Sequence, residues 1–209
     1  MRQDSFLLQP EPVQPDVWLL PQFTSAAALW DDLLAVSAAA PFRHMMTRMG
    51  YPVAAAMTNC GALGWTSDAR GYAYRAVDPE TGRPWPPIPP AWQALAREAA
   101  ALAGYADYAP DVCLVNRYAV GTGMGRHNDD SERDFSQPIV SVSLGLPTRF
   151  AWWGDRPAGR GRDLLLQDGD VLVWGGSARL GFHAVRPVPP GRHPVCGGFR
   201  FNLTFRKAG

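Results

Sequence analysis

The chain after residue 110 is divided by glycine and proline into short strand-forming segments, and this division restricts the fold more than any other feature. About seven segments have the composition and length of β-strands. They are residues 112–118, 139–146, 149–153, 163–166, 171–174, 182–185 and 199–206. Strands that follow one another so closely are typical of antiparallel sheets.

Two helices are expected before these strands. Residues 24–40 repeat apolar side chains near helical spacing, begin at Thr24 or Ser25, either of which can cap a helix, and end before Pro41. Residues 90–103 start with proline, present an apolar side and end before a glycine. Two helices followed by closely spaced strands predict an antiparallel double-sheet barrel with the helices on one side, and not a parallel sheet with alternating helices.

The rest of the chain is less regular. Residues 42–89 mix methionine and aromatic residues with glycine and proline, which predicts irregular hairpins. Residues 1–23 are expected to form an irregular arm with a short strand at 17–20. A chain of 209 residues, 46% of them hydrophobic, can bury one core of good size. We therefore expect a single domain over residues 1–209, of the α+β class and mainly β.

Charge and cysteine content narrow the classes of function. The formal net charge of +1 gives no overall attraction to nucleic acid or acidic membranes, so a polyanion would need a local patch. The cysteines are odd in number and form no CxxC pair, which argues against a disulfide framework and a zinc knuckle. They are Cys60, Cys113 and Cys196. Such cysteines fit a reducing, cytoplasmic setting. Acidic residues interrupt the N-terminal segment, and no later run is long enough to span a membrane, so neither a signal peptide nor a membrane span is expected.

The triplet His127-Asn128-Asp129 is a candidate metal site. In a strand-like conformation, residues two apart project to the same side, so the imidazole and the carboxylate can bind one ion. His183 is the leading third ligand. Two histidines and one carboxylate leave positions open for oxygen activation by iron, whereas zinc hydrolases favour tetrahedral sites. The triplet also occurs by chance, and His183 can equally be a core residue. The rival ligands are His44 and His193.

The last predicted strand, residues 199–206, alternates apolar and polar side chains, and its polar face carries two arginines. On the surface these arginines would be solvated. Inside a barrel, a buried arginine must meet an anion, and a dicarboxylate supplies two carboxylates. Six residues of strand span about 20 Å, so Arg200 and Arg206 would serve opposite ends of such a ligand. Asn116 and Tyr118 lie two residues apart on another strand and can bond the same ligand.

Five long segments carry a family pattern: MTNCGALGWTSDARGYAY, CLVNRYAVGTGMGRHND, PIVSVSLGLP, LLLQDGDVLVWGG and FRFNLTFRKAG. In order and spacing they resemble the bacterial AlkB demethylases of alkylated nucleobases. The resemblance runs from about residue 40 to the C-terminus. It implies a jelly-roll core, the double-stranded β-helix. It divides the chain into an arm and helix over about 1–40, a nucleotide-recognition lid over 42–89 and a catalytic core over 111–209.

The same resemblance implies the cofactors and the residues that bind them. The iron ligands would be His127, Asp129 and His183. The residues around 2-oxoglutarate, with Arg200 at its distal carboxylate, would be Asn116, Tyr118, Arg200, Asn202 and Arg206. The implied chemistry is oxidative dealkylation, in which Fe(II), 2-oxoglutarate and O2 convert an N-methyl group to formaldehyde while the co-substrate becomes succinate and CO2.

The resemblance further implies a pocket for one base. A methylated ring nitrogen inside a duplex cannot reach a buried iron, so the base must be unpaired or flipped out. Trp65 would stack on it opposite His127, with Met57 and Trp174 lining the pocket. Cationic 1-methyladenine and 3-methylcytosine would be preferred to unmodified bases. Without the resemblance, the aromatic residues of this segment would be interpreted as a small core beneath a loop.

One position at the rim of this pocket departs from the family. Bacterial relatives usually have an acidic residue four positions after the first metal histidine, where this chain has Ser131 between Asp130 and Glu132. Either acid can substitute at the exocyclic amine of the base, or the pocket accepts a different lesion or RNA. The implied contacts with the nucleic-acid backbone are Tyr72 and Tyr74. A basic loop that would meet a backbone or form a solvated hairpin tip contains Arg156, Arg160 and Arg162.

Residues and resemblance together predict a monomeric demethylase of N-alkylated bases in DNA, single strands by preference, that reverses alkylation damage. The rivals are the same chemistry on tRNA or another RNA, hydroxylation of a protein, and a reader of modified nucleic acid without turnover. The full set of candidate metal ligands and arginines argues against the reader, because binding alone needs no oxygen-activating centre.

Overall fold

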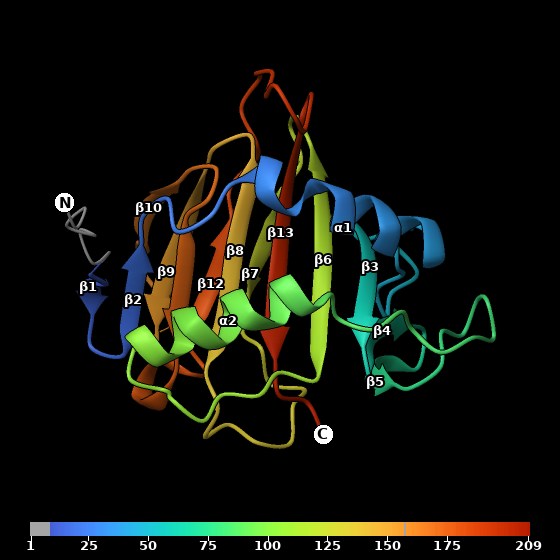
Figure 1. Cartoon of the computed structure of the whole chain (residues 1–209), viewed down its shortest axis with the longest axis horizontal. Coiled ribbons are helices and arrows are strands. Elements are labelled where there is room, and N and C mark those ends of the chain that lie inside the picture. The colour runs from blue at the N-terminus through green and yellow to red at the C-terminus, as the bar shows by residue number, and fades with distance from the viewer. Residues whose placement is uncertain (1–8, 157) are drawn as a thin grey trace, which may run out of the picture.

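The computed structural model describes residues 9–156 and 158–209, whose strands form two packed antiparallel sheets and a separate hairpin (Figure 1). The larger sheet has the order β1 (Glu11–Gln14), β2 (Val17–Leu20), β11 (Val171–Trp174), β8 (Ile139–Gly145), β13 (Phe199–Arg206), β6 (Val112–Ala119) and β3 (Ala56–Gly61). The smaller sheet has the order β10 (Arg162–Leu166), β9 (Thr148–Gly154), β12 (Phe182–Val185) and β7 (Met124–His127). The hairpin consists of β4 (Gly64–Asp68) and β5 (Gly71–Arg75).

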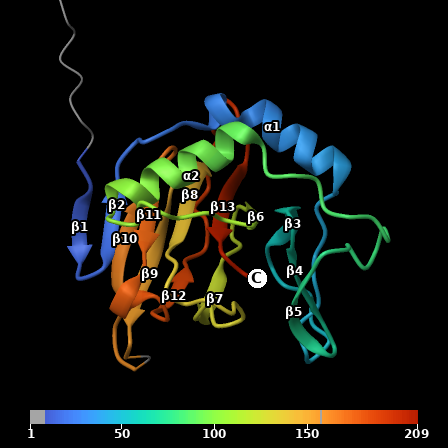
Figure 2. The ribbon, with the colours of Figure 1, turned by 60° about the horizontal axis from the view of Figure 1, so that its bottom comes forward.

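Two helices, α1 (Ala26–Ala39) and α2 (Pro90–Leu102), cross the same face of the larger sheet (Figures 1 and 2). Ser25 caps α1 by accepting a hydrogen bond from the backbone N–H of Ala28 at 3.3 Å. Proline begins α2, where a missing N–H costs no helical hydrogen bond. Both helices bury apolar stripes against the sheet, so the two predicted helices and their placement on one side are confirmed.

Strand β13 separates two cores. Phe201, Leu203 and Phe205 pack beneath the helices, whereas the polar residues of the alternation lie on the opposite side, between the sheets. Arg200 and Arg206 are both buried there. A second apolar cluster joins the two sheets around Phe150, Trp152 and Trp174. The predicted double-sheet fold is confirmed, with the jelly-roll arrangement that the resemblance implied.

Most predicted strands appear within one residue or so of their expected bounds, and the main differences lie elsewhere. β1 and β7 were not among the predicted strands, although an extended segment was expected at His127. Residues 42–89 contain the expected hairpin, but they also supply β3, which pairs with β6 as a full member of the larger sheet. Residues 1–8 of the predicted arm lie outside the described residues. Within the described part of the chain, no helix is long and apolar enough to cross a membrane.

Candidate metal centre and substrate pocket

The three candidate metal ligands come from two adjacent strands of the smaller sheet and from the loop that follows one of them. His127 ends β7, and His183 lies directly opposite it on β12. Asp129 follows in the loop after β7. One ligand atom from each residue lies within 4.8 Å of the others. The strand pairing thus brings the predicted triplet and the distant His183 into one cluster.

Both imidazole rings are oriented by backbone carbonyl groups. Nδ1 of His127 lies 2.8 Å from the carbonyl oxygen of Gly125, and Nδ1 of His183 lies 2.9 Å from that of Gly181. When each Nδ1–H donates to its carbonyl, Nε2 is left with a lone pair for a metal ion. Burial, together with the charge of His127, lowers the pKa of His183 to about 4. Its ring is therefore neutral, as metal ligation requires.

Aromatic side chains pack around His183. The rings of Phe150 and Trp152 stack on it with centroid distances of 5.3 and 6.0 Å, and Trp174 meets it edge-on at 5.3 Å. Gly181 makes this packing possible, because a Cβ there would clash with the Trp152 ring. Trp174 was a predicted pocket residue, whereas Phe150 and Trp152 were not singled out in the sequence.

The Asp129 carboxylate is ionised and incompletely bonded. Oδ1 pairs with Nη2 of Arg206 at 2.8 Å. Oδ2 lies 3.7 Å from Nε2 of His183 and has no hydrogen-bond partner among the described residues. Burial would raise the pKa of Asp129, but the charge of Arg206, with smaller contributions from the histidines, holds it well below its ordinary value. A buried anionic oxygen beside two imidazole nitrogens fits a divalent cation such as Fe(II).

Arg206 and Glu132 connect this carboxylate to the β4–β5 hairpin. The hydroxyl of Tyr74, on β5, donates to Oε1 of Glu132 at 2.5 Å and accepts from Nη1 of Arg206 at 3.0 Å. Burial raises the pKa of Tyr74, so its hydroxyl keeps the proton that it donates. Nη2 of Arg179 pairs with Oε2 of Glu132 at 3.1 Å. A residue predicted to contact nucleic acid therefore has its hydroxyl engaged inside the protein.

Arg179 is a buried residue of the site that the sequence did not indicate. It follows the short 3-10 helix η1 (Gly176–Ala178) and is 2% exposed. Its guanidinium donates to the carbonyl oxygens of Asp129 and Gln137, at 2.9 and 3.0 Å. These bonds fasten both ends of the loop between β7 and β8. A lone arginine in a turn has no periodicity, and its position four residues before His183 is the one sequence feature that could have drawn attention to it.

The metal cluster opens into a cavity of about 510 Å³ that the β4–β5 hairpin also lines. Thirteen of the predicted site residues line it. They are Met57, Trp65, Tyr72, Asn116, Tyr118, His127, Asp129, Ser131, Glu132, Trp174, His183, Asn202 and Arg206. The predicted residues Tyr74 and Arg200 do not form part of this lining.

Arg200 pairs with Tyr118 of β6, which lines the cavity, but Arg200 itself is not part of the lining. Its guanidinium donates to Oγ of Ser143 at 2.7 Å and to the carbonyl of Leu146 at 3.4 Å, while Nε has no hydrogen-bond partner among the described residues. Burial lowers the pKa of Arg200 to about 10, so the group is still charged at neutral pH. A buried cation without a carboxylate partner fits an anionic ligand. The unbonded Oδ1 of Asn116 is another polar atom available at this end of the cavity.

The hairpin presents aromatic rings to the cavity. Trp65 and Tyr72 stack with centroids 5.3 Å apart, and the guanidinium of Arg48 lies 5.5 Å from the Tyr72 ring. The side chain of Asn59 fixes the backbone of Trp65 by accepting from its N–H at 2.9 Å and donating to its carbonyl at 3.0 Å. Tyr72 is 50% exposed, so the stack reaches from the cavity to the surface.

The rival ligands and the basic loop lie apart from the metal cluster. His44 is exposed, and its Nδ1 lies 2.8 Å from the carbonyl oxygen of Val53. His193 lies 3.7 Å from Asp168. The arginines of the predicted loop are exposed in the β9–β10 connection or at its end, namely Arg156, Arg160 and Arg162.

Comparisons with known proteins agree with this geometry. The family model described as the 2OG-Fe(II) oxygenase superfamily matches residues 16–206. The chain is 48% identical over 200 residues to the alpha-ketoglutarate-dependent dioxygenase AlkB of Salmonella typhimurium, covering 95% of this chain and 93% of the relative. It is 48% identical over 187 residues to the AlkB of Escherichia coli, covering 90% and 87%. The solved structure of OsALKBH1 superposes with a TM-score of 0.80 at 25% identity, covering 95% of this chain and 99% of that one. The chain therefore belongs to the AlkB family of the 2OG-Fe(II) oxygenase superfamily, and it is a dioxygenase that uses Fe(II), 2-oxoglutarate and O2.

Proposed function

We propose that this dioxygenase removes methyl groups from N-alkylated bases such as 1-methyladenine and 3-methylcytosine in DNA, preferably in single strands, and so reverses alkylation damage. The observation that carries the proposal is the cavity that joins the His127–Asp129–His183 cluster to the aromatic side chains of Trp65 and Tyr72. A flat aromatic base and a methyl group to be oxidised require this combination.

In this proposal His127, Asp129 and His183 hold the iron. When bound together, Fe(II) and 2-oxoglutarate supply the activation of O2 that oxidises the methyl group, with succinate, CO2 and formaldehyde as products. Nε2 of each histidine and Oδ2 of Asp129 are the atoms available for this role. The aromatic rings around His183 keep water away from that side of the centre.

The proposed co-substrate residues are Asn116, Tyr118, Asn202 and Arg206 in the cavity, with Arg200 at the distal carboxylate. The support for Arg200 is that it is buried and charged with no carboxylate partner among the described residues. Tyr118 pairs with Arg200 across the two strands and lines the cavity, so its hydroxyl would bond the same carboxylate. Arg206 forms an ion pair with the carboxylate of Asp129, so Arg206 would orient this carboxylate beside the iron.

The base would stack between Trp65 and His127, with Met57 and Trp174 closing the pocket and Tyr72 holding the backbone. Glu132 accepts a hydrogen bond from Tyr74 and forms ion pairs with Arg179 and Arg206, so its carboxylate is engaged. We therefore assign the contact with the exocyclic amine to Ser131, assisted by the neighbouring Asp130. A hydroxyl at this position would select less strongly for a cationic base than a carboxylate would.

The proposal includes the organisation of the chain. Residues 42–89 would act as the nucleotide-recognition lid, residues 111–209 as the catalytic core, and about 1–40 as the arm and helix of the same single domain. The enzyme would act as a monomer in the cytoplasm. Single strands are favoured because an unpaired base enters the cavity without the cost of unstacking a pair.

Demethylation of RNA is a second candidate, which the replacement of the usual acid by Ser131 favours. Relatives over shorter stretches differ in substrate: a DNA N(6)-methyladenine demethylase of Arabidopsis thaliana is 35% identical over 108 residues, and a tRNA demethylase of Schizosaccharomyces pombe is 32% identical over 84 residues. A tRNA enzyme should act faster on structured RNA than on single-stranded DNA.

The test is methyl removal from matched oligonucleotides. Anaerobically purified protein would be given Fe(II), 2-oxoglutarate and air, with 3-methylcytosine in single-stranded DNA, duplex DNA or RNA. We expect the fastest repair in single-stranded DNA and none with His127→Ala. Faster repair of RNA would select the second candidate. Succinate formation without loss of the methyl group from any of these oligonucleotides would contradict both the DNA and the RNA candidate.

A further inference from the structure

The outer face of the smaller sheet, on the side away from the larger sheet, is rich in arginine. On β9, Phe150 and Trp152 face His183, so strand alternation turns Arg149 and Trp153 outward. Both helices lie on the larger sheet and leave this face uncovered (Figure 1). None of the roles proposed above uses these residues.

At the centre of this face, the side chains of Arg126, Trp153 and Arg186 form one cluster. The guanidinium of Arg126 lies 5.6 Å from the ring centroid of Trp153, and that of Arg186 lies 5.4 Å from it. The ring itself is fixed, because Nε1 donates to the carbonyl of Gly159 at 3.0 Å. It also lies against Gly161, where a Cβ would come within 2.7 Å of it. A fixed indole therefore orients two guanidinium groups by cation–π contact.

Small residues allow the side chains of separate strands to meet here. β12 runs between β7, which carries Arg126, and β9, which carries Trp153. Its outward residue is Ala184, which pairs with Ala151 of β9. Both alanines are buried although they face away from the other sheet. The larger side chains of the cluster therefore close over them.

The cluster adjoins the mouth of the cavity and adds local positive charge. Arg126 lines the cavity and directly precedes His127. Arg149 is exposed on the same face. Asp163 pairs with Arg186 at 3.1 Å and neutralises part of this charge. Since the whole chain carries a formal net charge of only +1, this is the kind of local patch that a polyanion needs.

We propose that the Arg126–Trp153–Arg186 cluster binds the phosphate backbone of the strand that continues from the base held in the cavity. The inference rests on the proposed function for the identity of that strand. The planar guanidinium forks match phosphate oxygens, and their ordering by Trp153 lowers the entropy lost on binding. The cluster extends the nucleic-acid contact from the lid to the opposite side of the cavity mouth.

The test is the salt dependence of binding to unmodified single-stranded DNA, measured by fluorescence anisotropy with the full chain. Removing one ionic interaction with a phosphate of a single strand reduces the slope of log K against log salt by about 0.7. We expect Arg186→Gln to bind several-fold more weakly and with a slope reduced by this amount. Asp163→Asn should do the reverse, binding more tightly with a steeper slope, because it releases Arg186 from its ion pair.

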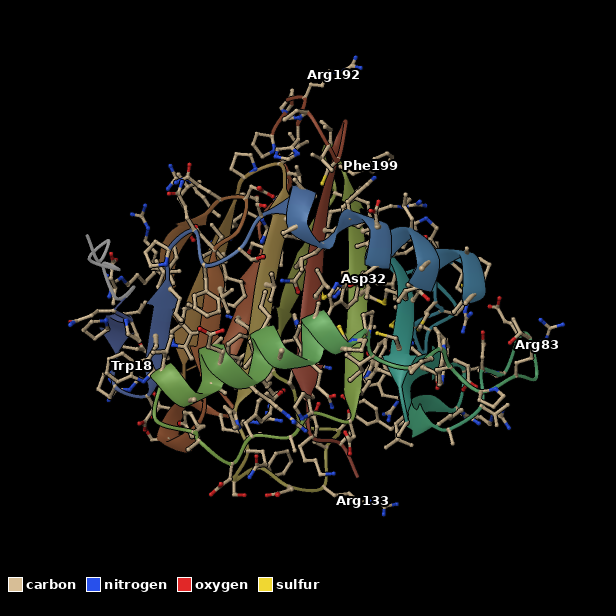
Figure 3. The ribbon with its side chains drawn as sticks, in the orientation of Figure 1. Trp18, Asp32, Arg83, Arg133, Arg192 and Phe199 are labelled. Atoms are coloured by element: carbon tan, nitrogen blue, oxygen red, sulfur yellow. The ribbon has the colours of Figure 1, made fainter. Side chains whose placement is uncertain are left out.

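Arg192→Gln is the matched control, because it also removes one positive charge. Figure 3 shows Arg192 at the top of the view, in the connection before β13, whereas the β4–β5 hairpin lies at the lower right (Figure 1). The same affinity and slope for Arg186→Gln and Arg192→Gln, with both variants folded, would overturn the proposal. The binding measurements use unmodified DNA and need no turnover. Their outcome can therefore be interpreted even if the demethylation test contradicts the proposed function.

Discussion

The charge and position of Asp129 depend on residues that are not themselves metal ligands. Its carboxylate is almost enclosed by protein, where an unpaired charge is costly. Arg206 pairs with one oxygen, and Arg179 donates to the backbone carbonyl of the same residue. The second oxygen is left to face His183. Two arginines distant in sequence thus keep the carboxylate ionised and hold it in place.

We predict that Arg179→Ala weakens metal binding although Arg179 is not a ligand. Loss of its bonds to the carbonyls of Asp129 and Gln137 frees the loop that carries the carboxylate. Removal of such supporting interactions typically lowers metal affinity about 10- to 100-fold. Anaerobic titration with Fe(II) measures the change. Arg133→Ala is the control, because Arg133 projects into solvent from the same loop (Figure 3). Equal affinities for the two variants would contradict this role.

Tyr74→Phe tests the link between the hairpin and the metal centre. The change removes the hydroxyl that joins Glu132 to Arg206 and leaves both buried groups short of one partner. We expect the free energy of unfolding to fall by about 1–3 kcal/mol, with weaker binding of 2-oxoglutarate in a direct titration. Tyr72→Phe, which leaves this network intact, should change neither quantity. If Tyr74→Phe left the free energy of unfolding unchanged, the hydrogen bonds of the Tyr74 hydroxyl would make no net contribution to stability.

The sequence indicated ligand types better than supporting interactions. His127, Asp129 and His183 are recognisable because metal chemistry restricts them to a few residue types at suitable spacing. Arg200 lies outside the cavity lining although its pairing partner Tyr118 is part of it, and this difference depends on side-chain packing that no spacing rule describes. Arg179 was missed for the same reason, since its partners are carbonyl groups that every residue possesses.

At the level of elements, the strict alternation of β13 could be recognised in the sequence, whereas β3 was not recognised as a strand of the larger sheet. β13 alternates strictly because the helices cover one side and the site lies on the other. In β3, Met57 packs toward the cavity and Cys60 toward the helices, so both faces are apolar and the alternation disappears. Its neighbouring glycines and prolines then resemble a loop. The pairing with β6 depends on residues distant in sequence.

The turn before β12 provides a test of packing at the element scale. In Gly181→Ala, the added Cβ would clash with the Trp152 ring, which stacks on His183. We expect the free energy of unfolding to fall by about 1–3 kcal/mol and metal affinity to fall with it. Gly198→Ala is the control, because nothing lies within 4 Å of its Cβ. Urea unfolding measures the stability of both variants. Equal losses of stability would contradict a specific role of the Gly181–Trp152 contact.

The start of the segment 42–89 is held in place by the ion pair between Arg43 and Asp78, whose contribution to stability depends on pH. Arg43 donates to both carboxylate oxygens of Asp78, at 2.9 and 2.7 Å. Burial would raise the pKa of Asp78, but the bonds from Arg43 outweigh it and the pKa is lowered. The pair therefore stabilises the fold above the ordinary aspartate pKa of about 3.9 and loses this effect as pH falls through the lowered value.

Asp78→Asn should accordingly cost about 1.5–3 kcal/mol of unfolding free energy at neutral pH. Its difference from the wild type should shrink as the pH falls below about 4, because protonation then weakens the pair in the wild type as well. Urea unfolding across this pH range measures both quantities. A difference that stays constant to the lowest pH would show that Asp78 acts through packing and not through its charge.

At the scale of the whole molecule, the cavity lies where the larger sheet, the smaller sheet and the β4–β5 hairpin meet. The larger sheet supplies Asn116, Asn202 and Arg206, the smaller sheet supplies the histidines, and the hairpin supplies Trp65 and Tyr72. Figure 2 shows the β4–β5 hairpin standing apart from β7 and β12. This division fits an enzyme that oxidises one part of a ligand while it holds the base between separate walls.

The most direct test of the central claim is the ratio of formaldehyde to succinate during turnover of single-stranded DNA that contains 3-methylcytosine. If the cavity places the methyl group beside an iron held by His127, Asp129 and His183, the two products should appear in equal amounts, and both should be lost in His127→Ala. Succinate without formaldehyde would show that O2 activation is not directed at a methylated base, and it would contradict the proposed demethylase.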